Sequence, residues 1–255
     1  MKNILEARKL NKIYTTGKDN SQQVLKDIDL DIMQGEFVSV MGPSGSGKST
    51  LLYNISGMDQ ITMGSVRFCG QELSTLPEEK LSELRLSKMG FIFQQSNLLK
   101  NLNLFDNIIL SAYLKKGESR QKVNDRAKEL MKHMGIDELK DNDITQASGG
   151  QLQRVAICRA LINNPAIVFG DEPTGALNSK ATGEVMDILA DINQSGTTIM
   201  LVTHDAKVAA KTERVLFMSD GAISGEKALG KYQKEKSDTK ARENQLSVWL
   251  SQMGF

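Results

Sequence analysis

The sequence contains few cysteines, no excess charge of either sign and no long apolar run. Its two cysteines, Cys69 and Cys158, share no C-x-x-C spacing, which argues against a disulfide framework or a zinc site and suits a reducing cytosol. The 32 basic and 31 acidic residues nearly cancel, so no overall field attracts nucleic acid or an anionic bilayer. We therefore expect no nucleic-acid partner.

The apolar stretches are also too short to span a membrane. Residues 199–202 and 108–110 are among the longest, whereas a helix needs about 20 apolar residues to cross a bilayer. Residues 1–10 alternate charged with single apolar side chains, unlike a secretion signal. These features predict a cytoplasmic protein that reaches the inner face of the cell membrane only through another polypeptide.

A glycine-rich loop follows the apolar run at residues 37–41. Residues 42–49 read G-P-S-G-S-G-K-S, the G-x-x-x-x-G-K-S pattern of loops that hold nucleotide phosphates. The glycines let backbone N–H groups converge on an anion, and the following helix adds its N-terminal dipole. Lys48 would reach the β- and γ-phosphates, and Ser49 would supply one oxygen to Mg²⁺. We expect a nucleotide at Gly42, Ser44, Gly45, Ser46, Gly47, Lys48, Ser49 and Thr50.

Strand and helix patterns alternate along most of the chain. This alternation predicts an α/β fold with a mainly parallel sheet. The expected strands are 4–14, 24–33, 37–41, 64–70, 91–93, 166–169, 198–203 and 215–218, and the expected helices are 48–56 and 180–193. Residues 96–164 are predicted to be a helical insertion, in which Ser119 caps a helix that ends at Gly135.

The last 30 residues, 226–255, form a charged extension. Lysine and acidic side chains crowd residues 226–243, so this segment has little to bury and is expected to be a solvated helix or a flexible tail. A second interpretation is that its apolar end docks on the domain, through Leu246, Trp249, Leu250 and Phe255.

Two adjacent carboxylates follow the apolar run at residues 166–169. Asp171 and Glu172 would then lie at the C-terminal end of a buried strand, the edge of an α/β sheet where ligands bind. Asp171 would hold Mg²⁺, directly or through water, and Glu172 would accept a proton from the attacking water. The alternative is an acidic pair that begins a helix before Pro173. The phosphate loop upstream favours the catalytic interpretation.

His204 follows another apolar run, at residues 198–203. A lone histidine at a strand end is often only a satisfied polar group. Here a neutral imidazole would hydrogen-bond the γ-phosphate or orient the attacking water, and we favour that role.

Paired glycines open the helix that follows residue 148. Ser148 and Gln151 make an S-x-x-Q capping box. A cap does not need Gly149 and Gly150 in the first turn, where each weakens the helix by about 1 kcal/mol. The pair is better explained as a second anion site under a helix dipole.

With these motifs the chain resembles the ATP-binding cassette family over residues 1 to about 225. The motifs occur in that family's order: Tyr14 as the aromatic residue that stacks on adenine, 42–49 as Walker A, Gln94 as the glutamine loop, 148–151 as the signature, 171–172 as Walker B, 176–178 as the D-loop and His204 as the switch histidine. Tyr14 also fits a core position of its strand.

The resemblance implies a P-loop NTPase (RecA-like) core at residues 1–95 and 165–225, with an antiparallel β edge and a helical subdomain at 96–164. It implies ATP and Mg²⁺ as cofactors and ATP hydrolysis as the activity. The implied catalytic residues are Lys48, Gln94, Glu172 and His204, and the implied Mg²⁺ ligands are Ser49, Gln94 and Asp171.

In that family two cassettes form a head-to-tail dimer, and each ATP lies between one Walker A loop and the other subunit's signature. The resemblance therefore implies a homodimer with two equal sites, in which Ser148, Gly149, Gly150 and Gln151 complete the partner's site. Two positions depart from the family pattern. Ala147 replaces a leucine before the signature, and Asn178 replaces the D-loop aspartate, which bears on communication between the sites.

Residues 41–47, 90–99 and 171–177 are similar to the macrolide-export and lipoprotein-release branch of the family. The run D-E-P-T-G-A-L and the charged tail are most similar to subunits that serve antimicrobial-peptide resistance. This similarity implies an integral-membrane permease of the macrolide-export or cell-division type as partner. Residues 94–105 would carry motion to it.

Other machines of this fold are weaker candidates. DNA-repair and chromosome-structure ATPases need a long coiled coil between Walker A and the signature, and only about a hundred residues separate Gly42 from Ser148. Translation-factor cassettes need two tandem copies. A lipoprotein-release or cell-division signalling ATPase that transports nothing itself stays open, and its permease would differ from the ten-span resistance type.

Overall fold

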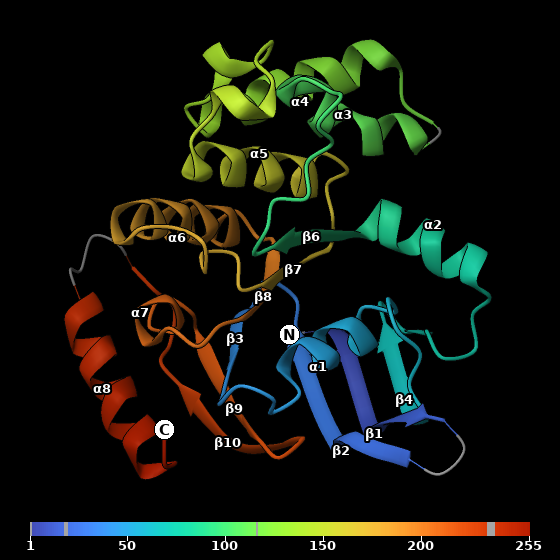
Figure 1. The fold of residues 1–255 in the computed structure, drawn as a ribbon, viewed down its shortest axis with the longest axis vertical. Coiled ribbons are helices and arrows are strands. Elements are labelled where there is room, and N and C mark those ends of the chain that lie inside the picture. Colours follow the sequence, from blue (N-terminus) through green and yellow to red (C-terminus); the bar gives the residue numbers. More distant parts are fainter. Residues whose placement is uncertain (1, 18–19, 116, 234–237) are drawn as a thin grey trace.

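A six-stranded sheet crosses the middle of the molecule and leads into the glycine-rich loop (Figure 1). The computed structural model describes residues 2–17, 20–115, 117–233 and 238–255. The strand order is β10-β9-β3-β8-β7-β6, and every neighbouring pair is parallel except β9 and β10. The strands are β3 (Phe37–Met41), β6 (Met89–Phe93), β7 (Ile167–Asp171), β8 (Thr198–Val202), β9 (Arg214–Ser219) and β10 (Ala222–Ala228). The predicted α/β fold with a mainly parallel sheet is confirmed.

The strands of the expected antiparallel β edge form a second, four-stranded sheet. Its order is β2-β1-β4-β5. The strands are β1 (Asn3–Thr16), β2 (Asn20–Met33), β4 (Met63–Phe68) and β5 (Gln71–Glu72). Apolar side chains from both sheets and from α1 (Lys48–Ile55) share one core. That shared core fixes α1, which begins at the glycine-rich loop, between the two sheets.

Most of the remaining helices lie on the other side of the main sheet or beyond it (Figure 1). They are α2 (Glu78–Lys88), α3 (Leu104–Leu114), α4 (Arg120–His133), α5 (Gly149–Leu161), α6 (Ser179–Gln194) and α7 (Ala206–Ala209), with short 3-10 turns at Asp137–Leu139 and Ile144–Gln146. Helices α3, α4 and α5 group together, as predicted for the middle of the chain. Across the described part of the chain, no helix has the length and apolar character to cross a bilayer.

Helix α4 follows its sequence signals closely. The Ser119 hydroxyl accepts a hydrogen bond from the backbone N–H of Lys122 at 3.4 Å, and Gly135 ends the helix with φ of 63°. Helix α2 was not predicted, because Leu81 is its single buried residue and an apolar stripe is absent from its sequence.

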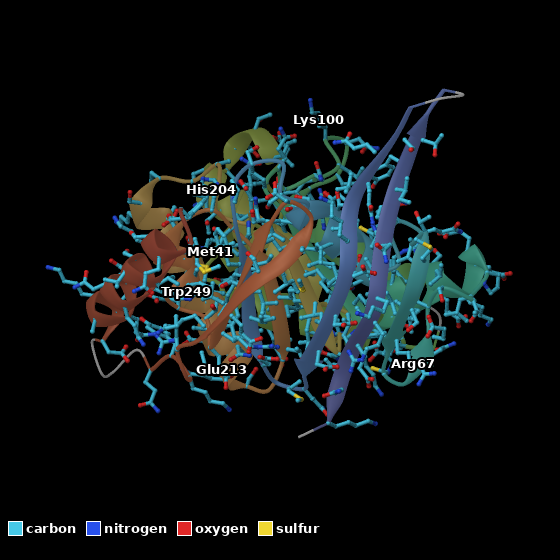
Figure 2. The ribbon with its side chains drawn as sticks, turned by 90° about the horizontal axis from the view of Figure 1, so that it is seen from below. Met41, Arg67, Lys100, His204, Glu213 and Trp249 are labelled. Atoms are coloured by element: carbon cyan, nitrogen blue, oxygen red, sulfur yellow. The ribbon has the colours of Figure 1, made fainter. Side chains whose placement is uncertain are left out.

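The expectation of a solvated helix or flexible tail at residues 226–243 holds only in part, because its first residues continue a strand and Arg242 is buried. Strand β10 continues through residue 228 and pairs with β9, so the boundary expected at residue 225 falls inside a strand. Helix α8 (Thr239–Gln252) docks on the main sheet, with Leu246 and Leu250 buried. Trp249 packs on the cluster that contains Met41, and both are labelled in Figure 2. The expected docking of the apolar end is therefore confirmed, although Phe255 stays 44% exposed.

Candidate functional site

The glycine-rich loop joins β3 to α1 in a conformation that other residues would not adopt. Gly42 has φ of 149°, and a Cβ there would lie 2.1 Å from the carbonyl oxygen of Met218. Gly47 is the N-cap of α1 with φ of 100°. An L-residue would be strained at both positions. The loop therefore presents its backbone N–H groups at a helix N-terminus, which is an arrangement that binds anions.

Lys48 is the first residue of α1 and is buried. Its ammonium donates hydrogen bonds to the carbonyl oxygens of Gly42 at 2.9 Å and Pro43 at 2.8 Å. Burial lowers the pKa of Lys48, and the negative charges of Glu172 and Asp171 act in the opposite direction. These contacts fix the ammonium against the loop, where it would meet a phosphate held by the loop.

Several candidate residues follow directly from the ends of parallel strands. Phe93, Asp171 and Val202 are register partners on β6, β7 and β8, so Gln94, Glu172 and His204 continue from neighbouring strands at one edge of the sheet. This is the edge where open α/β sheets bind ligands. Motifs that lie far apart in the sequence are thereby brought together.

Asp171 receives hydrogen bonds on both carboxylate oxygens. The Ser49 hydroxyl donates to Oδ1 at 2.8 Å, and the Tyr53 phenol donates to Oδ2 at 2.8 Å. A hydroxyl and a carboxylate are the hard oxygen ligands that Mg²⁺ prefers, with the rest supplied by water and phosphate. The Ser49 hydroxyl and the Asp171 carboxylate fit Mg²⁺ in that form. Within the described residues, no cluster of three His, Cys, Asp or Glu side chains could hold a metal by itself.

Glu172 and His204 form a hydrogen-bonded pair next to this carboxylate. Nδ1 of His204 lies 3.0 Å from Oε1 of Glu172. Glu172 has φ of 47°, in the left-handed region, and its backbone N–H donates to the carbonyl of Val202. Such backbone strain is concentrated at functional sites. In this conformation the Glu172 carboxylate meets the His204 ring.

A cleft of about 620 Å³ unites the loop with this pair, a size in the range of small-molecule sites. Its lining residues are Val24, Ser44, Gly45, Gly47, Lys48, Ser49, Thr50, Glu172 and His204. The candidates Gly42 and Ser46 do not line it. Ser46 is buried within the loop. Gln94 lies beside Gly175 and near Glu172. A Cβ placed on Gly175 would be 2.9 Å from the side-chain amide nitrogen of Gln94 and 3.2 Å from a carboxylate oxygen of Glu172.

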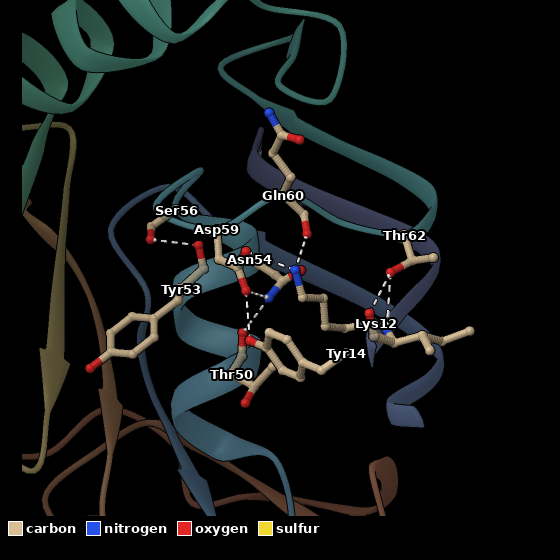
Figure 3. Close-up of polar contacts among 10 residues, drawn as sticks. Lys12, Tyr14, Thr50, Tyr53, Asn54, Ser56, Asp59, Gln60 and Thr62 are labelled. Atoms are coloured by element: carbon tan, nitrogen blue, oxygen red, sulfur yellow. Dashed lines mark hydrogen bonds and ion pairs between the residues drawn. The ribbon is translucent and has the colours of Figure 1, made fainter. Parts of the chain in front are cut away.

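Tyr14 lies outside this cleft lining, in a polar cluster at the end of α1 (Figure 3). Its phenol donates to Oδ2 of Asp59 at 2.6 Å, and the ammonium of Lys12 lies 4.6 Å from the ring centroid. Lys12 also donates to Oδ1 of Asp59 at 2.7 Å. Tyr14 is 40% exposed, so the interpretation of Tyr14 as a core residue is wrong. Its ring is held in place on the protein surface.

The segment at residues 148–151 begins α5 and forms the predicted capping box. The backbone N–H of Ser148 donates to Oε1 of Gln151 at 2.8 Å, and the N–H of Gln151 donates to the Ser148 hydroxyl at 3.4 Å. These residues line a second cleft, together with Ala176, Leu177 and Asn178, and it shares no lining residue with the first one. The structure therefore does not bring the signature segment to the phosphate loop of the same chain.

Asn178 and Ala147, which depart from the family pattern, both have structural roles. Asn178 is the N-cap of α6, and its Oδ1 accepts from the backbone N–H of Ala181 at 2.9 Å. This is the capping contact that an aspartate would also make. Ala147 packs against the apolar cluster of the helical segment.

Three residues at the site were missed in the sequence: Lys12, Tyr53 and Asp59. Tyr53 could have been found, because it lies four residues after Ser49 and thus on the same helix face. Lys12 and Asp59 meet only when β1 and the loop after α1 are folded together, so their pairing has no local signal.

The chain matches the family described as ABC transporter over residues 25–175. It is 43% identical to the bacitracin export ATP-binding protein BceA of Halalkalibacterium halodurans, over 86% of this chain and 87% of that protein. It is 42% identical to the lipoprotein-releasing system ATP-binding protein LolD 2 of Rhodospirillum rubrum, over 88% and 96%. It is also 41% identical to the macrolide export ATP-binding/permease protein MacB of Aggregatibacter actinomycetemcomitans. This match covers 99% of the present chain but 38% of the longer MacB protein.

A solved structure gives the same result for the fold. The dimeric, post-hydrolysis structure of the ATP-binding cassette MJ0796 with ADP and Pi superposes with a TM-score of 0.82 at 39% identity. The match covers 89% of this chain and all of that one.

Proposed function

We propose a function from one premise: this chain belongs to the ABC transporter family and carries that family's ATPase domain. It binds and hydrolyses ATP and drives a membrane permease through ATP-dependent dimerisation. The relative BceA is named for bacitracin export, and residues of this chain resemble the peptide-resistance subunits. We therefore propose resistance to, or export of, an antimicrobial peptide as its role.

The proposed dimerisation is supported mainly by the separation of the two clefts within one chain. One contains the phosphate loop, and the other contains residues 148–151 at the start of α5. A Cβ on Gly149 would make only an ordinary contact of 3.7 Å with Leu177, so the fold of a single chain does not require glycine there. A phosphate presented by a second copy does, because backbone N–H groups must approach it closely. The solved relative MJ0796 is itself dimeric.

The candidate residues in and beside the first cleft have separate chemical tasks in this proposal. The loop N–H groups and Lys48 bind the β- and γ-phosphates. Ser49, Asp171 and Gln94 would hold Mg²⁺, which supplies charge neutralisation of the phosphates when bound. Glu172 accepts the proton of the attacking water. His204, 3.0 Å from Glu172, orients that water and contacts the γ-phosphate.

We propose that the permease docks on a groove of about 450 Å³ between α2, β6, α3 and α5. The guanidinium of Arg159, on α5, donates to the carbonyls of Ser96 at 2.6 Å and Asn97 at 2.7 Å. These bonds join the signature helix to the segment after Gln94. Movement of α5 on dimer closure would therefore move the floor of the groove. The permease is of the macrolide-export or cell-division type and holds the chain at the inner face of the membrane.

A second function is favoured by one observation. The chain is 42% identical to LolD 2, the same level as to BceA. An ATPase that drives lipoprotein release, or a cell-division type of signalling complex, would use the same two clefts. The two functions differ in the permease and not in the ATPase chemistry.

The test uses the variant Glu172→Gln with saturating ATP and Mg²⁺. Without the base, turnover is expected to fall by about 10² to 10⁴, while binding persists and the ATP-bound dimer accumulates in size exclusion. The matched control is Glu129→Gln, which makes the same change at an exposed position on α4 and should behave as wild type. A Glu172→Gln chain that stays monomeric under these conditions would contradict the shared sites.

A further inference from the structure

Tyr53 makes a contact that the roles above leave unexplained. Its phenol donates a hydrogen bond to Oδ2 of Asp171, at 2.8 Å, on the oxygen that Ser49 does not use.

The geometry of helix α1 explains this arrangement. Ser49 and Tyr53 are four residues apart on α1 and share one face, and α1 packs beside β7, which ends at Asp171. Figure 3 shows the Tyr53 ring extending to the side of α1 opposite Tyr14. Two hydroxyls from a single helix thus bind the two oxygens of one carboxylate. A carboxylate held at both oxygens cannot rotate freely about its Cβ–Cγ bond.

We propose that Tyr53 is a positioning residue for the Mg²⁺ site, an inference that rests on the proposed function. It anchors Oδ2 of Asp171 so that Oδ1 stays directed at Ser49, another expected ligand. It acts through the carboxylate and does not itself bind the metal. Hydrogen bonds of this kind to ligating carboxylates orient them, and their removal costs about 10- to 100-fold in metal affinity or activity.

Packing alone is the competing explanation. Tyr53 also contacts the apolar core shared by the two sheets, so a truncation would disturb that core. The variant Tyr53→Phe keeps the ring and removes only the hydroxyl, which separates the two roles.

The experiment measures how the affinity for a non-hydrolysable ATP analogue depends on free Mg²⁺. In Tyr53→Phe, the Mg²⁺ concentration at half-maximal effect is expected to rise by about 10- to 100-fold, while analogue affinity in EDTA is unchanged. The control is Tyr113→Phe on α3, whose phenol donates to Asn124 at 2.6 Å, away from the site. It removes the same atom and should match wild type.

Three outcomes overturn the inference. An unchanged Mg²⁺ dependence shows that the hydroxyl does not position the carboxylate. An equal loss of analogue affinity with and without Mg²⁺ shows a structural role only. A wild-type chain that binds no nucleotide refutes the proposed function itself, and the inference with it, so the two failures can be told apart.

Discussion

The strongest test of the fold concerns Arg242, which attaches α8 to the rest of the protein. Its side chain is 6% exposed and donates to four backbone carbonyls: those of Ala210 at 2.7 Å, Thr212 at 2.8 Å, Leu229 at 2.8 Å and Gly230 at 2.9 Å. Burial lowers the pKa of this guanidinium, and nearby acidic groups act in the opposite direction. One residue thus joins α8 to the segment after α7 and to the end of β10.

The variant Arg242→Met keeps most of the apolar stem and removes every donor. The bonds to Ala210 and Thr212 are buried, and a buried carbonyl that loses its donor costs about 1–3 kcal/mol. The other two carbonyls are partly exposed and regain water. The substitution also removes a buried charge, which offsets part of this loss of stability. We expect a net destabilisation of about 2–4 kcal/mol, a large share of the roughly 5–15 kcal/mol of a typical domain.

Urea unfolding and amide hydrogen exchange measure this loss. The free energy of unfolding should fall, and the amides of Leu246 and Leu250 should lose protection first if α8 detaches locally. The control Arg67→Met removes an exposed arginine paired with Glu72 at 3.5 Å, a contact worth less than about 1 kcal/mol. Equal behaviour of the two variants would refute the claim that Arg242 holds the helix.

Two further predictions concern the nucleotide. Lys48→Ala removes the buried ammonium at the loop, and each charge-assisted bond to phosphate is worth about 1.5–3 kcal/mol. Titration with a fluorescent ATP analogue should therefore show at least a tenfold loss of affinity. Unchanged affinity would contradict the assignment of the phosphate loop. Asp59→Asn weakens the hydrogen bond that holds Tyr14. We expect the affinity for ATP to fall by roughly 2- to 10-fold and the affinity for tripolyphosphate, which lacks a base, to stay unchanged. Equal effects on both ligands in calorimetry would exclude contact between the Tyr14 ring and the adenine base.

Much of the fold and of the geometry of the glycine-rich loop was predictable because the signals are local. The conformation of residues 42–49 follows from the glycine positions, and the cap of α4 follows from Ser119. Parallel strands end at one edge of their sheet, so the strand pattern predicted that Asp171, Glu172 and His204 lie at that edge. The ABC transporter family was recognisable from the same ordered motifs, and the comparisons confirm it.

The contacts between distant segments were decided only by the tertiary structure. The spacing of Ser49 and Tyr53 places them on one helix face, but their common partner Asp171 is 118 residues from Tyr53. Lysine-rich composition suggested a solvated tail, yet the carbonyls that bind Arg242 come from two other segments. Helix and loop conformations follow from neighbours along the chain. A buried donor, by contrast, is stable only where the packed elements supply its acceptors, and no stretch of sequence encodes that by itself.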